Sequence, residues 1–128
     1  DPPYWESTVA AWESRFKSYD RRQAVVPWWT NRFRQIGYAC RSLNGAIRSG
    51  EIHHHVDEVD HLSRHVRNCV RRTVNARHEE GRPLWSVKKP APGRKIDAAM
   101  ALVLAWEARN DSLAAGALRK RPKAVGFR

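Results

Sequence analysis

The stretch that decides the fold is TNRFRQIGYACRSLNGAIRSG, residues 30–50. Its large apolar residues recur at spacings of three and four, the period of one face of an α-helix. Thr30 or Asn31 can cap the start of this helix, and Gly50 can end it. The periodic positions are Phe33, Ile36, Cys40, Leu43 and Ile47. The sequence therefore predicts an amphipathic helix that ends near Ser49 and buries one face against the rest of the chain.

Further elements are predicted on both sides of this helix. An apolar stripe at Trp5, Val9, Trp12 and Phe16 predicts a helix, and the alternation over 83–88 predicts a strand. Before the helix that ends near Ser49, we expect a helix over 4–18 and an edge strand over 24–29. After it, we expect an extended piece or loop over 51–55, a helix from about 57 to before 81, a strand over 83–88 and a helix over 95–110.

This order of helices and strands is typical of an α/β fold, but two strands make a poor sheet. Two strands alone leave unpaired backbone groups at the sheet edges and an uncovered apolar face. The chain also begins at Asp1 rather than at a methionine. We therefore expect further strands upstream of Asp1, so that the chain is the C-terminal portion of a larger α/β domain.

The charge balance predicts a polyanionic partner. The chain has 24 lysines and arginines against 13 acids in 128 residues, a formal charge of +11. Such a field attracts nucleic acid first of all. Six tryptophans and 41% hydrophobic residues predict that most of the chain folds. We expect a folded part over 1–112 and a disordered basic tail over 113–128, whose residues 119–128 carry five positive charges and no acid.

Several functional classes are not supported by the sequence. No apolar run of membrane-spanning length and no signal peptide is present, so we expect no membrane partner and no secretion. The phosphate-binding patterns GxxxxGK[ST] and GxGxxG are absent, so no ATPase is encoded in this stretch. Cys40 and Cys69 are expected to be small core residues on the buried faces of two helices; a disulfide or a reactive thiol is the alternative.

Histidines cluster at positions 53, 54, 55, 61 and 65. His61 and His65 are one helical turn apart, which is zinc-ligand spacing. Three adjacent histidines cannot all face one ion, and no cysteine pair supports them. The favoured interpretation is a polar surface, with His65 packed at a helix boundary.

Asp97 is the acid whose position carries most information. It lies in GRKIDAAMA, residues 93–101, in the first turn of an alanine-rich helix that follows basic residues. It is either an acid favoured by the helix dipole or a metal-binding carboxylate at a helix start that DNA can approach. The basic residues that would neutralise phosphates beside it are Lys88, Lys89, Arg94 and Lys95. A merely solvated basic loop is the alternative for these four.

A set of short motifs occurs in a fixed order along the chain. The motifs are DPPYW at 1–5, TNR at 30–32, GEIH at 50–53, LSRH at 62–65 with Asn68, and KIDAAMA at 95–101. In this order they resemble the end of the large terminase subunit of tailed bacteriophages. The resemblance extends from Asp1 to about Arg109, and the turn over residues 95–99 is its most specific part.

The resemblance implies a partial ribonuclease H-like nuclease fold, a mixed sheet flanked by helices, whose N-terminal strands are missing from this chain. It implies a metal-dependent endonuclease that cuts concatemeric double-stranded DNA, with Asp1 and Asp97 as catalytic, metal-binding acids. A third acid has no counterpart in this chain, and two extra residues around 53–60 leave no histidine assigned. The fragment alone is then expected to be weak or inactive.

Two Mg²⁺ or Mn²⁺ ions are the expected cofactors, because such a pair supplies both the nucleophile and leaving-group stabilisation in phosphodiester cleavage. The partners implied by the resemblance are double-stranded DNA, an upstream ATPase domain, the small terminase subunit and the portal. The implied location is the host cytoplasm during phage assembly. The alternative function is a non-catalytic basic module that binds nucleic acid.

Overall fold

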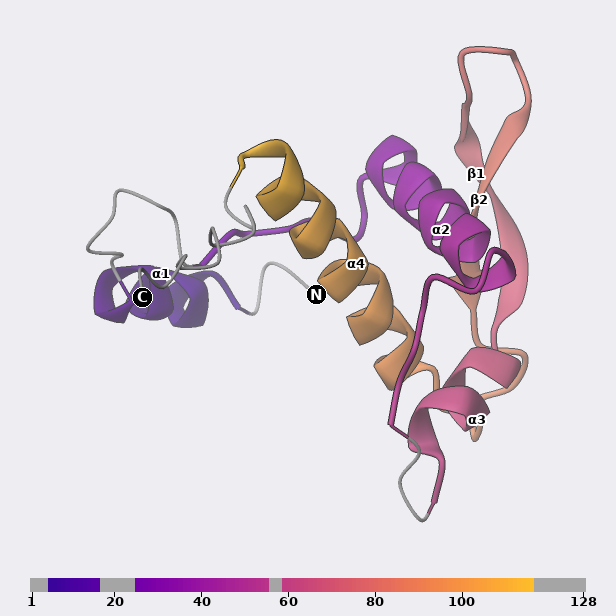
Figure 1. The fold of residues 1–128 in the computed structure, drawn as a ribbon, viewed down its shortest axis with the longest axis horizontal. Helices are drawn as coiled ribbons and strands as arrows, with labels where there is room; N and C mark the ends of the chain where they lie inside the picture. The colour runs from indigo at the N-terminus through magenta and orange to yellow at the C-terminus, as the bar shows by residue number, and fades with distance from the viewer. Residues whose placement is uncertain (1–4, 17–24, 56–58, 117–128) are drawn as a thin grey trace, which may run out of the picture.

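The computed structural model describes residues 5–16, 25–55 and 59–116. Over these ranges the protein is mixed α/β, with a two-stranded antiparallel sheet. Figure 1 shows α2 lying along the hairpin, α4 beside α2, α3 near the base of the hairpin, and α1 apart from the other helices. The elements are α1 (Glu6–Arg15), α2 (Phe33–Arg48), α3 (His61–Arg67), β1 (Val70–Arg77), β2 (Pro83–Lys88) and α4 (Asp97–Ala114).

The predicted helix over 30–50 is confirmed as α2, and its end is set by Gly50. Gly50 has φ +74°, a left-handed conformation that glycine adopts without strain. The amides of Gly50 and Glu51 donate to the carbonyls of Ile47 and Ala46, which satisfies the last turn as a Schellman motif. The predicted cap at Thr30 or Asn31 is wrong. The N-cap is Arg32, whose side chain makes no capping hydrogen bond. Thr30 and Asn31 instead belong to the preceding turn, in which the amide of Arg32 donates to the carbonyl of Trp29.

The helix predicted from about 57 to before 81 is wrong in its second half. The helix α3 ends at Arg67, and the chain continues as strand β1, which pairs antiparallel with β2. Val66, Val70 and Val74 have helical spacing, but the β-branched residues at 70, 73 and 74 also favour a strand. The pairing of residues 70–77 with residues 83–88 stabilises the strand rather than the helix. The predicted strand over 83–88 is confirmed as β2.

The core lies where α2 packs on the hairpin and on α4. Leu84 of β2 is 1% exposed, and a Cβ at Gly37 of α2 would lie 2.8 Å from its Cβ. The strand and helix therefore approach as closely as a glycine permits. Trp106 of α4 donates its indole N–H to Ser42 Oγ of α2 at 2.9 Å. The main buried cluster is Ile36, Ala39, Cys40, Leu43, Ala46, Val103 and Trp106.

The region before α2 differs from expectation. The helix predicted over 4–18 is present as α1, but none of its residues is buried. No strand exists over 25–29, the described part of the predicted strand. Pro27 has no N–H to pair, and Trp28 packs against the core cluster instead of joining a sheet.

The last helix, α4, spans 97–114 rather than the predicted 95–110. The predicted basic tail falls largely on 117–128, which lie outside the described residues. In the part of the chain that the structure describes, no helix is long and apolar enough to cross a membrane.

Candidate nucleic-acid interface

Basic side chains are concentrated on α3, the hairpin and the loop that follows it, residues 61–96, which we call the basic segment. This segment carries ten lysines and arginines against two acids, Glu79 and Glu80. All ten are exposed. They are Arg64, Arg67, Arg71, Arg72, Arg77, Arg82, Lys88, Lys89, Arg94 and Lys95. The expected site residues Lys88, Lys89, Arg94 and Lys95 are thus part of a larger set of exposed basic residues.

The register of the hairpin brings basic residues of both strands together. Val70 pairs with Lys88, and the next two residues of β1 are Arg71 and Arg72. The guanidinium of Arg71 lies 4.3 Å from the centre of the Trp85 ring, a cation–π contact that holds it over the sheet. The two strands contain no acid. Successive residues of a strand project to opposite faces, so Arg72 and Lys88 share one face of the hairpin and Arg71 lies on the other. An anionic ligand on the first face would be attracted by both Arg72 and Lys88.

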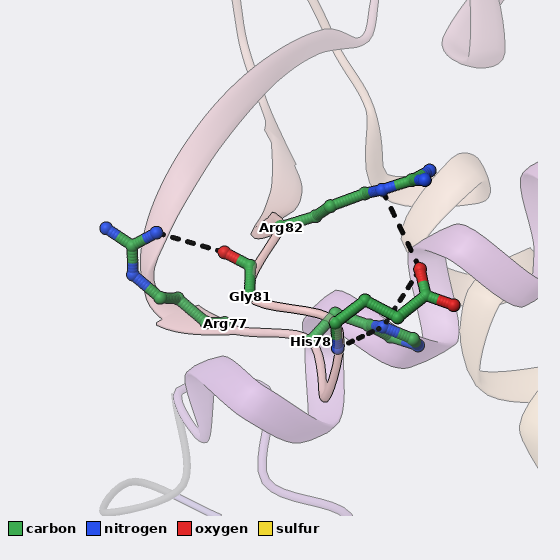
Figure 2. Close-up of polar contacts among 5 residues, drawn as sticks. Arg77, His78, Gly81 and Arg82 are labelled. Atoms are coloured by element: carbon green, nitrogen blue, oxygen red, sulfur yellow. Dashed lines mark hydrogen bonds and ion pairs between the residues drawn. The ribbon is translucent and has the colours of Figure 1, made fainter.

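The two acids of the segment, Glu79 and Glu80, are adjacent residues between β1 and β2. Figure 2 shows the polar contacts at this hairpin turn, with Arg77, His78, Gly81 and Arg82 around it. Glu80 Oε2 lies 3.7 Å from Arg82 Nε and 3.8 Å from His78 Nδ1. Arg77 donates to Gly81 O at 3.0 Å, and Gly81 has the positive φ that closes the turn. Glu80 therefore offsets positive charge at the turn of the hairpin and not along its two strands. Neither Arg72 nor Lys88 forms an ion pair with any described residue.

Asp97 is the first residue of α4, and its carboxylate is exposed. An acid at this position is favoured by the helix dipole. The start of α4 is held by α3: the amide N–H of Ala98 donates to His65 Nδ1 at 3.0 Å, and Asn68 Nδ2 donates to Lys95 O at 2.8 Å. Two hydrogen bonds thus fix the backbone on either side of Asp97.

The structure does not bring Asp97 together with a second predicted acid. Asp1 lies outside the described residues. Among the residues that are described, no group of three or more His, Cys, Asp or Glu side chains could hold a metal ion. The described part therefore supplies one carboxylate and not a complete metal site.

The histidines are used differently from zinc ligands. The rings of His61 and His65 lie 6.4 Å apart, but His65 Nδ1 accepts from Ala98, and His61 Nδ1 contacts Arg64 at 2.7 Å. The interpretation of His65 as a residue packed at a helix boundary is confirmed. His53, His54 and His55 are exposed, as expected for a polar surface.

The cysteines are free thiols that line the same cavity, about 190 Å³ in volume. Cys40 is buried on α2 as predicted; Cys69 is half-buried and lies between α3 and β1, because the helix expected there ends at Arg67. Burial raises the pKa of both thiols. Raised thiol pKa values disfavour the reactive thiolate.

Sequence reasoning missed Arg71, Arg72 and Arg77 because their segment was expected to be helical. The signal that could have found them is the density of β-branched residues at Val70, Thr73 and Val74. Comparisons with protein-family models, with curated proteins and with solved structures gave no match to this chain.

Proposed function

We propose that this chain is the C-terminal portion of a metal-dependent DNA endonuclease of the phage terminase type. The observation that carries the proposal is the position of Asp97. Its exposed carboxylate stands at a helix start that α3 fixes by two hydrogen bonds, shortly after the exposed Arg94 and Lys95 in the sequence. An exposed carboxylate that follows basic residues is suited to a site where a metal and a DNA phosphate meet.

In this proposal the basic segment binds the DNA backbone and Asp97 contributes one acid to the metal site. When bound, a pair of Mg²⁺ or Mn²⁺ ions would activate water and stabilise the leaving oxygen. One exposed carboxylate is insufficient for two ions, so Asp1 and a third acid must complete the site. The exposed side chains Lys88 and Lys89 would neutralise phosphates and fix the register of the duplex.

A ribonuclease H-like domain is proposed as the larger fold. Within the described residues, each strand of the hairpin is paired on one side only. Its outer edges can therefore accept further strands, as a larger mixed sheet requires. An ATPase domain, the small terminase subunit and the portal are the partners that this proposal implies, in the host cytoplasm during phage assembly.

The test is cleavage by the full encoded protein carrying Asp97→Asn. We expect loss of Mg²⁺- or Mn²⁺-dependent plasmid nicking with DNA binding retained, because Asn lacks the charge that a hard cation needs. The matched control is Asp111→Asn, which removes the same charge from the same helix, about 21 Å away by the helical rise. Full nicking activity in the Asp97 variant would reject the assignment.

A non-catalytic nucleic-acid-binding module is the second candidate. It is favoured by the ten-to-two charge ratio of the basic segment. It predicts salt-sensitive DNA binding with no cleavage and no dependence on Asp97. Measuring binding and nicking on the same preparations distinguishes the two candidates.

A further inference from the structure

A cavity of about 190 Å³ lies where α2, α3, α4 and the hairpin meet. We call it the central cavity. Its lining combines the amide of Asn44 and the guanidinium of Arg71 with apolar side chains from all four of these elements. The elements pack on one another, so the fold itself holds the walls in place. The apolar side chains of the lining include Leu43, Val66, Trp85, Val87 and Val103.

The central cavity can be reached from solvent. Ile47 and Arg71 in its lining are both exposed, Ile47 to 43%. Leu43 and Val103, which also line it, are only 6% and 3% exposed. A ligand can therefore enter beside Arg71 and bury an apolar part against the core.

The size and the walls of the cavity suit one aromatic ring. An apolar cavity of about 150 Å³ holds a benzene molecule. A volume of about 190 Å³ therefore accommodates one ring with a small substituent. Trp85 forms one wall, and its packing against the core cluster fixes its position. Aromatic pairs attract each other by more than their buried area accounts for, so Trp85 favours an aromatic ligand over an aliphatic one.

Two polar groups of the lining have donors left for a ligand. The amide of Asn44 forms no hydrogen bond with any described residue, and Arg71 forms no ion pair with one. The guanidinium of Arg71 lies 4.3 Å from the centre of the Trp85 ring, a contact with the ring face that leaves its N–H groups unused. A guanidinium binds a carboxylate or phosphate through two parallel hydrogen bonds. Arg71 is thus placed to recognise an anionic group attached to the ring.

We propose that the central cavity binds a small molecule with one aromatic ring and one anionic group. The ring lies beside Trp85, the anion pairs with Arg71, and Asn44 can bond a polar substituent on the ring. Two sources share this chemistry: a free aromatic carboxylic acid, and a pyrimidine nucleotide, whose base is a single ring and whose phosphate is the anion. The proposal does not depend on nuclease activity, because Arg71 lies on the opposite face of the hairpin from Arg72 and Lys88.

The test is ligand-observed fluorine NMR with para-fluorobenzoate and the full chain. We expect saturable broadening of the fluorine resonance. Arg71→Gln should weaken binding by about tenfold, as loss of a hydrogen bond between charged groups implies. Arg72→Gln is the matched control, because it removes the same charge from the next residue, which does not line the cavity. It should leave the affinity unchanged.

A second variant fills the cavity. Ala99 of α4 lines it and is 5% exposed, so the added carbons of Ala99→Leu occupy the space of the ring and should abolish the broadening. Ala101→Leu adds the same side chain at an exposed position of the same helix and should bind as the natural protein does. Circular dichroism confirms that each variant is folded, and the Arg71 variant decides if Ala99→Leu is not.

Competition identifies the source of the ligand. Thymidylate, followed by phosphorus NMR, should displace para-fluorobenzoate if the natural ligand is a nucleotide. Binding of para-fluorobenzoate without displacement by thymidylate would support a free aromatic acid. Binding of neither compound, or binding that is unchanged in both Arg71→Gln and folded Ala99→Leu, would overturn the proposal.

Discussion

The hairpin and the region of α1 with residues 27–30 both combine tryptophan with charged residues, but the charged residues described there differ in sign. On the hairpin, Arg71 lies over Trp85 and no acid is present in either strand. Beside α1, Glu6 and Glu13 line a cavity together with Trp5, Trp28 and Trp29. A tryptophan therefore does not identify a partner by itself. The basic residues that accompany it predict a polyanion for the hairpin.

The two regions also differ in how they are held. The hairpin is fixed to α2 through Leu84, which is 1% exposed, whereas Trp12 of α1 remains 46% exposed. Folding free energy follows burial of apolar surface. The stability of the protein should therefore reside in the hairpin, α2 and α4, with α1 contributing surface rather than core.

The largest expected effect tests this difference in packing directly. Leu84→Ala should lower the free energy of unfolding by about 2–5 kcal/mol, because it leaves a cavity against α2. Trp12→Ala should cost under about 0.5 kcal/mol, as is usual for an exposed site. Denaturant unfolding followed by far-ultraviolet circular dichroism measures both. Equal losses in the two variants would show that α1 is part of the core.

A smaller effect is expected where α2 and the hairpin approach most closely. Gly37→Ala should destabilise the protein by about 1–3 kcal/mol, because its Cβ would lie 2.8 Å from Leu84 Cβ. Gly45→Ala is the matched control on the same helix, where a Cβ meets nothing within 4 Å. It should stabilise by about 0.5–1 kcal/mol through helix propensity. The same unfolding assay decides, and a neutral Gly37→Ala would contradict the close contact.

The link between α3 and α4 should have an effect of about 1 kcal/mol. His65→Ala removes the acceptor for the Ala98 amide at the start of α4. It should lower the free energy of unfolding by about 1 kcal/mol, the usual cost of losing a helix cap. His53→Ala removes an exposed histidine before α3 and should leave the unfolding free energy unchanged. If both variants were equally stable, the hydrogen bond to His65 would not support α4.

The smallest expected effect is a pH dependence at the start of α3. Asp60 caps α3 by accepting from Ser63 N–H, and hydrogen bonding to Ser63 lowers the pKa of its carboxyl below 3.8. A lowered folded-state pKa gives stability above the unfolded pKa and loses it as the pH falls through the folded value. Asp60→Asn should therefore melt slightly earlier than the natural protein at pH 7. The difference should shrink as the pH falls through the folded-state pKa of Asp60, and a constant difference would exclude the charge as its cause.

Local patterns predicted α2, β2 and most of α4, because each has a clear helical or alternating period. They failed for β1, since valines at 66, 70 and 74 fit a helix as well as a strand. Only pairing with 83–88 settles that choice, and pairing is a tertiary interaction. The place of Asp97 in the first turn of a helix was predicted from its local context and is confirmed, whereas the Ala98–His65 bond joins residues 33 apart and has no local signature.

The central claim is that the basic segment is where nucleic acid binds, and the salt dependence of double-stranded DNA binding tests it most directly. Arg72→Gln/Lys88→Gln, on one face of the hairpin, should reduce the slope of log K against log salt by about 1.8, or 0.9 for each phosphate contact. Arg41→Gln/Arg48→Gln removes the same charge from exposed positions of α2 and should leave the slope nearly unchanged. Equal changes in both variants, or none in the hairpin variant, would contradict the account.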